Sequence, residues 1–210
     1  MRRIPLNDLN PWFQTLDDVA GQDGRITSRT LFGNNRPLEI DVGCGRGLFV
    51  FTASLARPDT NFLGIELDFK EARRAAKRLQ KREAANARIL GGDVFQAFTE
   101  LIPPRSVDAV HVYFPDPWWK RRHRRRRVFN DRFVDLCATL LKRGGLVHSW
   151  TDVEEYFEVI SALMDNHAEF EKLPQPEERA PVNDLDYHTS FERKKRKLGL
   201  PIYRSQWRRR

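Results

Sequence analysis

Short apolar runs alternate along this chain with longer stretches in which apolar residues recur at helical spacing. We interpret the runs as buried strands and expect them at Leu38–Val42, Asn61–Glu66, Ala87–Gly91, Asp108–Phe114 and Gly145–Trp150. The stretches between them predict helices at Leu48–Ala56, Phe69–Ala85, Val94–Leu101 and Asp131–Lys142. Such alternation is typical of an α/β fold with a mostly parallel central sheet and helices on both faces, whose ligands lie at the carboxyl ends of the strands.

The two ends of the chain are less regular. Residues 1–36 show no sustained period, and we expect them to be an N-terminal extension of a single domain that spans residues 37–210. Phe170–Pro181 is rich in Pro and Glu and is predicted to be a linker. Arg193–Arg210 then forms a basic tail, and the sequence leaves open whether it becomes ordered only on a polyanionic partner.

The residues after the fifth strand predict one more helix. Asp152 and Glu155 have the spacing of a capping box. The apolar residues near and after them share one helical face: Val153, Tyr156, Phe157, Ile160, Leu163 and Met164. We expect this helix to be structural.

A glycine-rich loop follows the first predicted strand. Gly43–Gly47 reads GCGRG and opens a helix, so its backbone can approach a ligand without interference from Cβ atoms. A dinucleotide fingerprint would place its third glycine at position 48, which is Leu48, and this mismatch argues against a nicotinamide cofactor. Asp41 precedes the loop and favours a ligand that carries an ammonium group, such as S-adenosylmethionine, over a pyrophosphate.

Acidic residues end three successive predicted strands. Glu66 stands where a carboxylate accepts hydrogen bonds from ribose hydroxyls, although a solvated strand end would look the same. Asp93 could face an adenine edge or cap the following helix. Together with Asp41, Gly43 and Gly45, these two acids predict a binding site for a nucleoside-containing cofactor.

An acidic turn and a dense cationic run follow the fourth strand. Asp116 lies between Pro115 and Pro117, which restrict the turn. Lys120–Arg127 contains seven basic residues in eight, which could be a solvated loop or a surface for a polyanion. The net charge of +8 is concentrated in this run and in Arg193–Arg210, while the remainder is net acidic. Nucleic acid is therefore the expected polyanion.

The remaining composition gives no sign of metal or membrane chemistry. Cys44 and Cys137 have no paired metal-ligand spacing and are too few for a disulfide framework, so we expect reduced thiols. The chain contains no apolar stretch of signal or membrane-spanning length. A cytoplasmic protein without a resident metal is the expectation, and the sequence does not distinguish a monomer from a homodimer.

Five motifs together resemble the bacterial tRNA (guanine-N7-)-methyltransferase family: DVGCGRG, GIELD, GGDV, FPDPWWKRRHRRRR and TSFE. The resemblance covers Leu38 to Glu192, and Phe114–Arg127 is its most specific part. It implies a Rossmann-like class I methyltransferase that depends on S-adenosylmethionine and acts on a guanosine in the tRNA variable loop. Asp41 stands where many members have Glu, a departure that implies a shorter reach toward an ammonium group.

The resemblance also implies roles for individual residues. Contacts to the cofactor would be made by Asp41, Gly43, Gly45, Glu66, Asp93 and Asp116. Contacts to the substrate would be made by Lys120, Asp152, Thr189, Ser190, Phe191 and Glu192. Thr189 and Glu192 also have the spacing of an ordinary helix start.

Guanine N7 carries a lone pair and no proton, so its methylation needs alignment rather than a general base. We therefore expect Asp116 to be catalytic by accepting hydrogen bonds from guanine N1–H and the N2 amino group. The basic residues from Lys120 to Arg127 are expected to contact phosphates, and His123 among them to shape the loop. Trp118 could stack on a base or pack within the protein.

Two other functions fit the same residues. The chain could methylate another structured RNA, because the glycine loop and the basic run would serve that reaction equally. It could also be a non-catalytic RNA-binding module on the same fold, which would retain RNA without binding the methyl donor. The acids at three strand ends argue against the second alternative.

Overall fold

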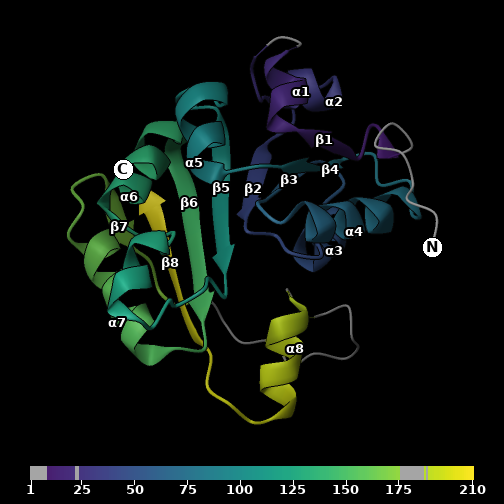
Figure 1. Ribbon diagram of the computed structural model, residues 1–210. Coiled ribbons are helices and arrows are strands. Elements are labelled where there is room, and N and C mark those ends of the chain that lie inside the picture. The colour runs from purple at the N-terminus through teal and green to yellow at the C-terminus, as the bar shows by residue number, and fades with distance from the viewer. Residues whose placement is uncertain (1–8, 22–23, 176–186, 188) are drawn as a thin grey trace. The chain divides into compact units, whose positions relative to one another are not determined.

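Strands and helices alternate along the chain in the computed structural model, which describes residues 9–21, 24–175, 187 and 189–210 (Figure 1). The chain divides into two compact units, Met1–Pro103 and Pro104–Arg210. Within the described ranges, no helix is both long enough and apolar enough to cross a membrane.

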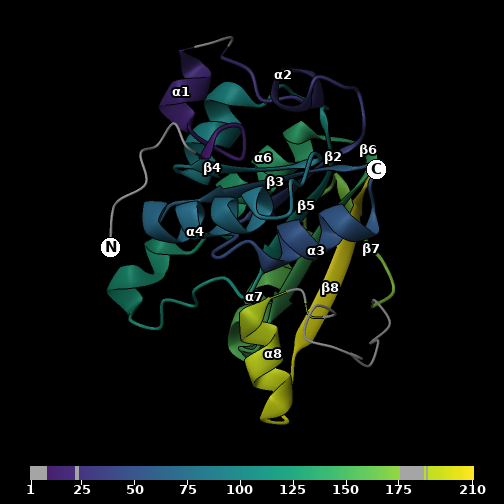
Figure 2. The ribbon, with the colours of Figure 1, turned by 90° about the vertical axis from the view of Figure 1, so that its right-hand side faces the viewer.

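The first unit contains a four-stranded parallel sheet in the order β1-β4-β3-β2. Its strands are β1 (Phe13–Thr15), β2 (Leu38–Val42), β3 (Asn61–Glu66) and β4 (Ala87–Gly91). Its helices are α1 (Leu16–Ala20), α2 (Ser28–Phe32), α3 (Leu48–Ala56), α4 (Phe69–Gln80), α5 (Val94–Gln96) and the π-helix η2 (Ala97–Leu101). Helices α3 and α4 lie on one face of this sheet, and α1 and α2 lie on the other (Figures 1 and 2).

Burial explains why these elements form where the pattern predicted them. Asn61 through Ile65 of β3 are all buried, as expected for a strand covered on both faces. Helix α4 buries Ala72, Ala75, Ala76 and Leu79 completely, and these residues form one stripe at helical spacing. The predicted bounds of β2, α3, β3 and β4 are confirmed, whereas α4 ends at Gln80, short of the predicted Ala85.

An edge strand of the first sheet comes from the N-terminal segment, where the sequence predicted no element. Phe13–Thr15 pairs with β4, and Phe13 is only 3% exposed. The indole N–H of Trp12 donates to the Ala84 carbonyl oxygen at 2.9 Å. A strand of three residues is too short to produce a recognisable period, which is why the sequence did not predict it.

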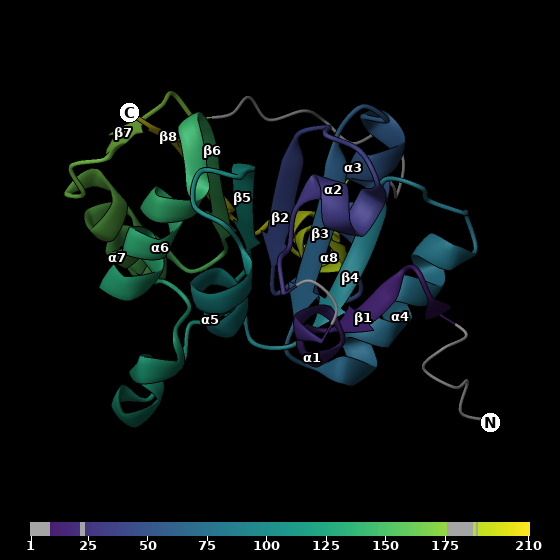
Figure 3. The same ribbon diagram turned by 90° about the horizontal axis from the view of Figure 1, so that it is seen from above.

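The second unit contains a mixed sheet in the order β5-β6-β8-β7, in which only the β5–β6 pair is parallel. Its strands are β5 (Val107–Tyr113), β6 (Leu141–Thr151), β7 (Phe170–Lys172) and β8 (Tyr203–Arg209). Its helices are the 3-10 helix η3 (Arg121–Arg126), α6 (Asp131–Leu140), α7 (Glu154–Asp165) and α8 (Ser190–Lys197). Helices α6 and α7 lie on one side of this sheet (Figure 3).

Three predictions for the second unit were wrong. Helix α6 ends at Leu140 and not at Lys142, because β6 begins at Leu141 and not at Gly145. Asp152 does not cap α7, because the residue before the helix is Val153 and no side chain caps the helix start. The Asp152 carboxylate instead pairs with Lys195, 2.7 Å away. The predicted linker at Phe170–Pro181 begins with β7, because Phe170 is buried and pairs with Arg209. The part of this predicted linker from 176 to 181 lies outside the described residues.

The basic tail is part of the fold. Strand β8 lies between β6 and β7, and Trp207 at its centre is fully buried and donates from its indole N–H to Asp165 at 2.6 Å. Arg204 is 5% exposed, with its guanidinium 4.8 Å from the Trp150 ring centroid. Tertiary contacts of this kind give arginines a structural role that a count of charges cannot reveal.

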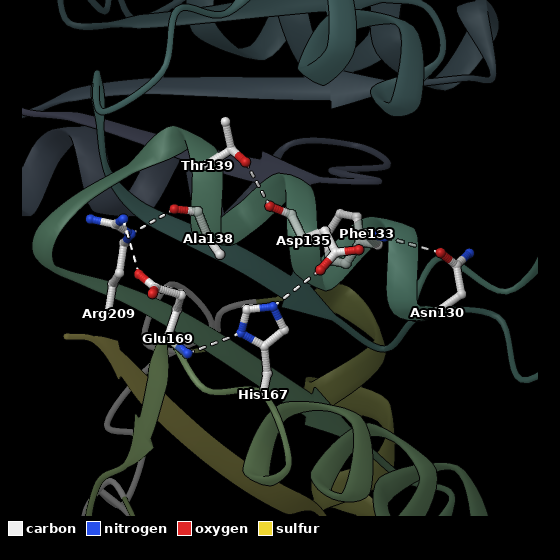
Figure 4. A network of polar contacts seen from close by, with 8 residues as sticks. All are labelled: Asn130, Phe133, Asp135, Ala138, Thr139, His167, Glu169 and Arg209. Carbon is white, nitrogen blue, oxygen red and sulfur yellow. Dashed lines mark hydrogen bonds and ion pairs between the residues drawn. The ribbon is translucent and has the colours of Figure 1, made fainter.

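Arg209 fastens the end of β8 through the network in Figure 4. Its Nε donates to the Ala138 carbonyl oxygen at 2.6 Å, and its Nη2 lies 3.2 Å from the Glu169 carboxylate. Nearby, the backbone N–H of Glu169 donates to Nδ1 of His167 at 3.2 Å. Nε2 of His167 therefore carries the ring proton and donates to Asp135 at 3.1 Å. These bonds connect β8 with α6 and with the segment before β7.

We therefore expect β8 to be ordered without RNA. In hydrogen exchange on the free protein, the amides of Ser205 and Trp207 should exchange at least about 1,000-fold more slowly than those of η3, because β8 pairs on both sides. Exchange of β8 amides as fast as that of η3, with protection only after tRNA is added, would show that this strand forms on RNA.

Candidate functional site

The loop between β2 and α3 contains three glycines with positive φ angles. Its glycines Gly43, Gly45 and Gly47 have φ angles of +68°, +54° and +63°. The Gly43 N–H donates to the Ile65 carbonyl oxygen at 2.9 Å, which fixes the loop against β3. A Cβ atom on Gly45 would meet no heavy atom within 4 Å, whereas one on Gly47 would lie 2.7 Å from Cβ of Ala75. Gly45 therefore leaves room for a ligand, and Gly47 lets α4 pack closely.

Glu66 supports the loop from the neighbouring strand. One carboxylate oxygen accepts from the Gly45 N–H at 2.8 Å, and the other accepts from the Asp68 N–H at 2.8 Å. The sequence assigned Glu66 to a ligand and did not predict these bonds to the protein. Each carboxylate oxygen has two lone pairs, so the side chain retains the capacity to accept hydrogen bonds from a ligand.

Asp41 is a buried acid beside Glu66. It is 5% exposed, and burial together with the negative charge of Glu66 raises the pKa of its carboxyl group well above the usual value. Both influences disfavour the ionised form. A cation bound next to Asp41 would oppose them, so this side chain fits a ligand that brings an ammonium group.

Cys44 fills the space behind the loop. Burial and the charges of Asp41 and Glu66 raise the pKa of its thiol well above the usual value, so the thiol stays protonated and unreactive. A Cβ atom on Gly64 would lie 2.6 Å from Sγ of Cys44. Gly64 in β3 therefore makes room for the loop, a role that the sequence analysis missed although a glycine inside an apolar strand signals close approach.

Asp93 follows β4 and caps α5. Its carboxylate accepts from the Phe95 N–H at 2.8 Å, which confirms the capping interpretation. The neighbouring Gly92 N–H donates to the Glu66 carbonyl oxygen at 3.0 Å and so connects the ends of β4 and β3. Because β2, β3 and β4 are adjacent, Asp41, Glu66 and Asp93 lie along one edge of the sheet.

The acidic turn after β5 is fixed by its backbone. Phe114 and Trp118 have φ angles of +53° and +43°, which cost non-glycine residues on the order of 1 kcal/mol each. The Phe114 N–H donates to the Trp150 carbonyl oxygen at 2.7 Å, and Nε of Arg127 donates to the Pro117 carbonyl oxygen at 2.7 Å. These bonds leave the Asp116 side chain exposed.

Tyr156 lies beneath this turn. Its side chain is fully buried, and the Arg127 guanidinium lies 4.7 Å from its ring centroid. Burial is the main reason that the pKa of Tyr156 is raised to about 12, and the negative charge of Asp116 adds to the shift. Arg127, which the sequence assigned to phosphate, is thus engaged with the fold.

The basic run forms the 3-10 helix η3. Arg121, Arg122 and Arg125 are exposed along it. Trp118 packs against this helix, because the Arg126 guanidinium lies 5.1 Å from its ring centroid and His123 meets it edge-on at 5.8 Å. These contacts favour packing over base stacking for Trp118 and are consistent with a loop-shaping role for His123.

The start of α8 contacts the acidic turn. The Thr189 hydroxyl accepts from the Glu192 N–H at 2.9 Å, and the Glu192 carboxylate is buried and accepts from Nε of Arg196 at 2.8 Å. Phe191 is 47% exposed, and its ring centroid lies 5.4 Å from that of Phe114. Ser190 begins the helix, but its side chain lies outside the described part of the structure.

Lys195 completes this contact and was missed by sequence reasoning. Its Nζ lies 2.7 Å from Oδ2 of Asp152 and 5.2 Å from the Phe191 ring centroid. The structure thus brings together the predicted residues Asp152 and Phe191 at the turn, whereas Lys120 is exposed and takes no part in the contact. The sequence could have indicated Lys195 only by its spacing of four residues from Phe191.

Comparison with solved structures identifies the fold. A crystal structure of an aminoglycoside resistance methyltransferase matches with a TM-score of 0.58 and 18% identity, over 88% of this chain and 95% of that one. A SAM-dependent O-methyltransferase from Thermotoga maritima matches with a TM-score of 0.52 and 18% identity, over 93% of this chain and 71% of that one. The predicted Rossmann-like methyltransferase fold is therefore confirmed.

Sequence comparison identifies the family. A family model described as "Putative methyltransferase" matches residues 35–205. A tRNA (guanine-N(7)-)-methyltransferase from Rhodopirellula baltica is 47% identical over 98% of this chain and 77% of the relative. One from Rubrobacter xylanophilus is 32% identical over 85% of this chain and 79% of the relative. On this evidence, the chain belongs to the tRNA (guanine-N(7)-)-methyltransferase family.

Proposed function

We propose that this chain transfers a methyl group from S-adenosylmethionine to N7 of a guanosine in the variable loop of tRNA. The observation that carries the proposal is the 47% identity, over 98% of the chain, to a relative named for this reaction. The open glycine loop and the acids at three neighbouring strand ends support it. They supply the groups that a nucleoside with a charged amino acid moiety needs.

The first unit supplies the residues that would bind the methyl donor. The ammonium group of the donor would lie beside Asp41, where it would offset the burial and the negative charge that now raise the pKa of this acid. Glu66 would accept hydrogen bonds from ribose hydroxyls, and Asp93 would face the adenine. Gly43 and Gly45 allow this approach, because a Cβ atom on either would point into open space.

The main requirement of this reaction is that the protein aligns guanine N7 with the methyl group of the donor. The lone pair of guanine N7 attacks the methyl carbon of the sulfonium, the bond from that carbon to sulfur breaks, and the purine acquires the positive charge. No proton is removed in this step. Correct orientation of two reactants can lower a barrier by about 7–11 kcal/mol, more than a general base usually contributes.

Asp116 would orient the guanine and stabilise the charge that develops on it. Its exposed carboxylate can accept hydrogen bonds from guanine N1–H and the N2 amino group. Adenine has no donor at N1, so it would lack this pair of hydrogen bonds. The Phe114 backbone N–H and the Arg127 side chain hold the turn in place through bonds to carbonyl oxygens, without using the Asp116 side chain.

The remaining site residues divide between RNA contact and positioning. Lys120 and the exposed arginines of η3 would contact phosphates. Asp152 pairs with Lys195 of α8 and would hold this helix against the turn. Glu192 pairs with Arg196 four residues further along α8 and would stabilise the helix itself. Thr189 would do so by capping α8. Phe191 is exposed beside Phe114 and is the member of this group best placed to touch RNA.

The direct test is an assay with purified protein, unmodified tRNA and labelled methyl donor, followed by nucleoside analysis. We expect 7-methylguanosine in the wild-type digest. The Asp116→Asn variant should lose about 100- to 1,000-fold in turnover, because it loses a charged acceptor that acts in the transition state, while its affinity for the donor stays within about twofold. Asp131→Asn, which neutralises an exposed carboxylate of α6, is the matched control.

Two outcomes of this assay would count against the proposal. Methylation of the tRNA at another nucleoside, or faster methylation of another structured RNA in a parallel reaction, would replace the proposed substrate. Turnover of Asp116→Asn equal to that of the control would remove Asp116 from the mechanism while leaving the reaction in place.

Asp41→Asn should change stability and donor affinity in opposite directions. Because the folded state raises the pKa of Asp41, its favourable contribution to stability is present below the unfolded pKa and is lost as pH rises through the folded pKa. At neutral pH, the neutral amide should therefore raise the melting temperature of the free protein. Affinity for S-adenosylmethionine should fall about 10- to 100-fold, since a charge-assisted bond is lost.

Thermal melts and calorimetry check this prediction, with Asp59→Asn as the control at an exposed acid. The control should alter neither quantity. A lower melting temperature for Asp41→Asn, or donor affinity equal to that of the wild type, would contradict the role assigned to Asp41.

A further inference from the structure

Helix α4 carries a concentration of positive charge that the reaction does not explain. The helix and the two residues that follow it, Phe69–Arg82, contain seven cations and one acid, Glu71. The cations are Lys70, Arg73, Arg74, Lys77, Arg78, Lys81 and Arg82. By contrast, α7 in the second unit begins with exposed Glu154 and Glu155.

The two faces of α4 are sharply divided. One face packs Ala72, Ala75, Ala76 and Leu79 against the sheet with no exposure to solvent. Four cations spaced at three or four residues follow the opposite side: Lys70, Arg74, Lys77 and Lys81. We call these four residues the α4 stripe. At 1.5 Å per residue the α4 stripe extends about 16 Å, long enough to lie along several consecutive phosphates of a nucleic acid strand.

This arrangement is unfavourable for an isolated helix. Lys70 with Arg74, and Arg74 with Arg78, are like charges four residues apart within α4, and Lys77 with Lys81 extends the series through the C-cap. Each such pair destabilises a helix by about 0.2–0.5 kcal/mol. A solvated helix face usually alternates charges of opposite sign and so avoids this repulsion. A polyanion lying along the α4 stripe would convert the repulsion into attraction.

The one acid of the helix lies at the end nearest the glycine loop. Glu71 pairs with Arg46 of that loop at 2.8 Å and also with Arg74, and its hydrogen bond with Arg46 is the main reason that the pKa of Glu71 is lowered. Arg46 keeps 61% of its side chain exposed. Positive charge therefore continues from the glycine loop along α4, away from the edge of the sheet where the methyl donor would bind.

We propose that the α4 stripe is a second RNA-binding surface, which contacts the phosphate backbone of the substrate at a distance from the methylated base. This inference rests on the proposed function for the identity of the RNA. The surface would contribute to affinity and to its dependence on salt, without reading base sequence. It lies in the first unit and is separate in sequence from the basic run of η3.

The test compares two double variants that remove the same charge. Lys77→Gln/Lys81→Gln alters the α4 stripe. Arg105→Gln/Arg143→Gln removes two exposed arginines near the N-terminal ends of β5 and β6, at the sheet edge opposite to the expected ligands. Binding of unmodified tRNA is measured by filter retention over a range of salt concentrations, and donor binding by calorimetry.

We expect the α4 double variant to bind tRNA about tenfold more weakly and to lower the slope of log K against log salt by about 1.5–2, because two phosphate contacts are lost. The Arg105/Arg143 control should keep the wild-type slope. Donor affinity and turnover at saturating tRNA should match the wild type for both, so the α4 change appears in KM. The melting temperature of the α4 variant should be equal or higher, since the Lys77–Lys81 repulsion is removed.

The proposal is overturned if the α4 variant binds tRNA like the control, or if both variants weaken binding equally, which would reflect net charge alone. Failure here is separable from failure of the proposed function. If the wild-type protein methylates tRNA and the α4 variant binds tRNA normally, only the proposal of a second RNA-binding surface is excluded. If the wild-type protein forms no 7-methylguanosine, the proposed function itself is excluded.

Discussion

The two hydrogen bonds accepted by Glu66 are the interactions on which the proposed donor site depends. They connect the end of β3 to the Gly45 N–H and to the Asp68 N–H, and so fix both the glycine loop and the start of α4. Asp41 is buried beside this carboxylate with its pKa raised. The free protein thus keeps two acids close together at a cost in electrostatic energy. A ligand with an ammonium group and hydroxyl donors would relieve that cost, which links the stability of the site to its selectivity.

The arginines of this chain serve two different purposes that only the structure separates. Arg127, Arg204 and Arg209 are directed into the protein, where they bond to carbonyl oxygens or lie against aromatic rings. Arg121, Arg122 and Arg125 of η3 remain exposed, as do Lys70, Arg74 and Lys81 of the α4 stripe, while Lys77 is partly exposed. We assign these side chains to RNA. Net charge alone therefore overestimates the surface available to a polyanion in the tail and overlooks the surface on α4.

The sequence predicted the central strands and helices because their periodic patterns are strong and local. Strands β2, β3 and β4 are short, apolar-rich runs bounded by loop residues, and helix α3 between the first two is mostly apolar, so their bounds could be predicted directly. Strands β1 and β7 have three residues each, and β8 is rich in arginine, so none of them shows a pattern that composition or period can identify. Their stability comes from pairing partners far away in the sequence.

The sequence predicted part of the candidate site. The acids at strand ends follow from strand positions alone, because parallel strands place their carboxyl ends on one edge. The roles of Arg127 and Lys195 depend on contacts with Pro117 and Asp152 that no local pattern predicts. Gly64, which makes room for Cys44, could have been identified as a glycine inside an apolar strand. The predicted capping box at Asp152 was wrong because the Asp152 carboxylate pairs with Lys195, a residue far away in the sequence.

The most direct test of a preformed donor site is a crystal structure of the protein with S-adenosylhomocysteine. We expect the ligand amino group within hydrogen-bonding distance of Asp41, at about 2.7–3.2 Å, and the ribose hydroxyls at Glu66. The Glu66 bond to the Gly45 N–H should persist, and the loop backbone should move by less than about 1 Å. A ligand bound away from these acids, or a loop that must release Glu66 to admit it, would contradict the account.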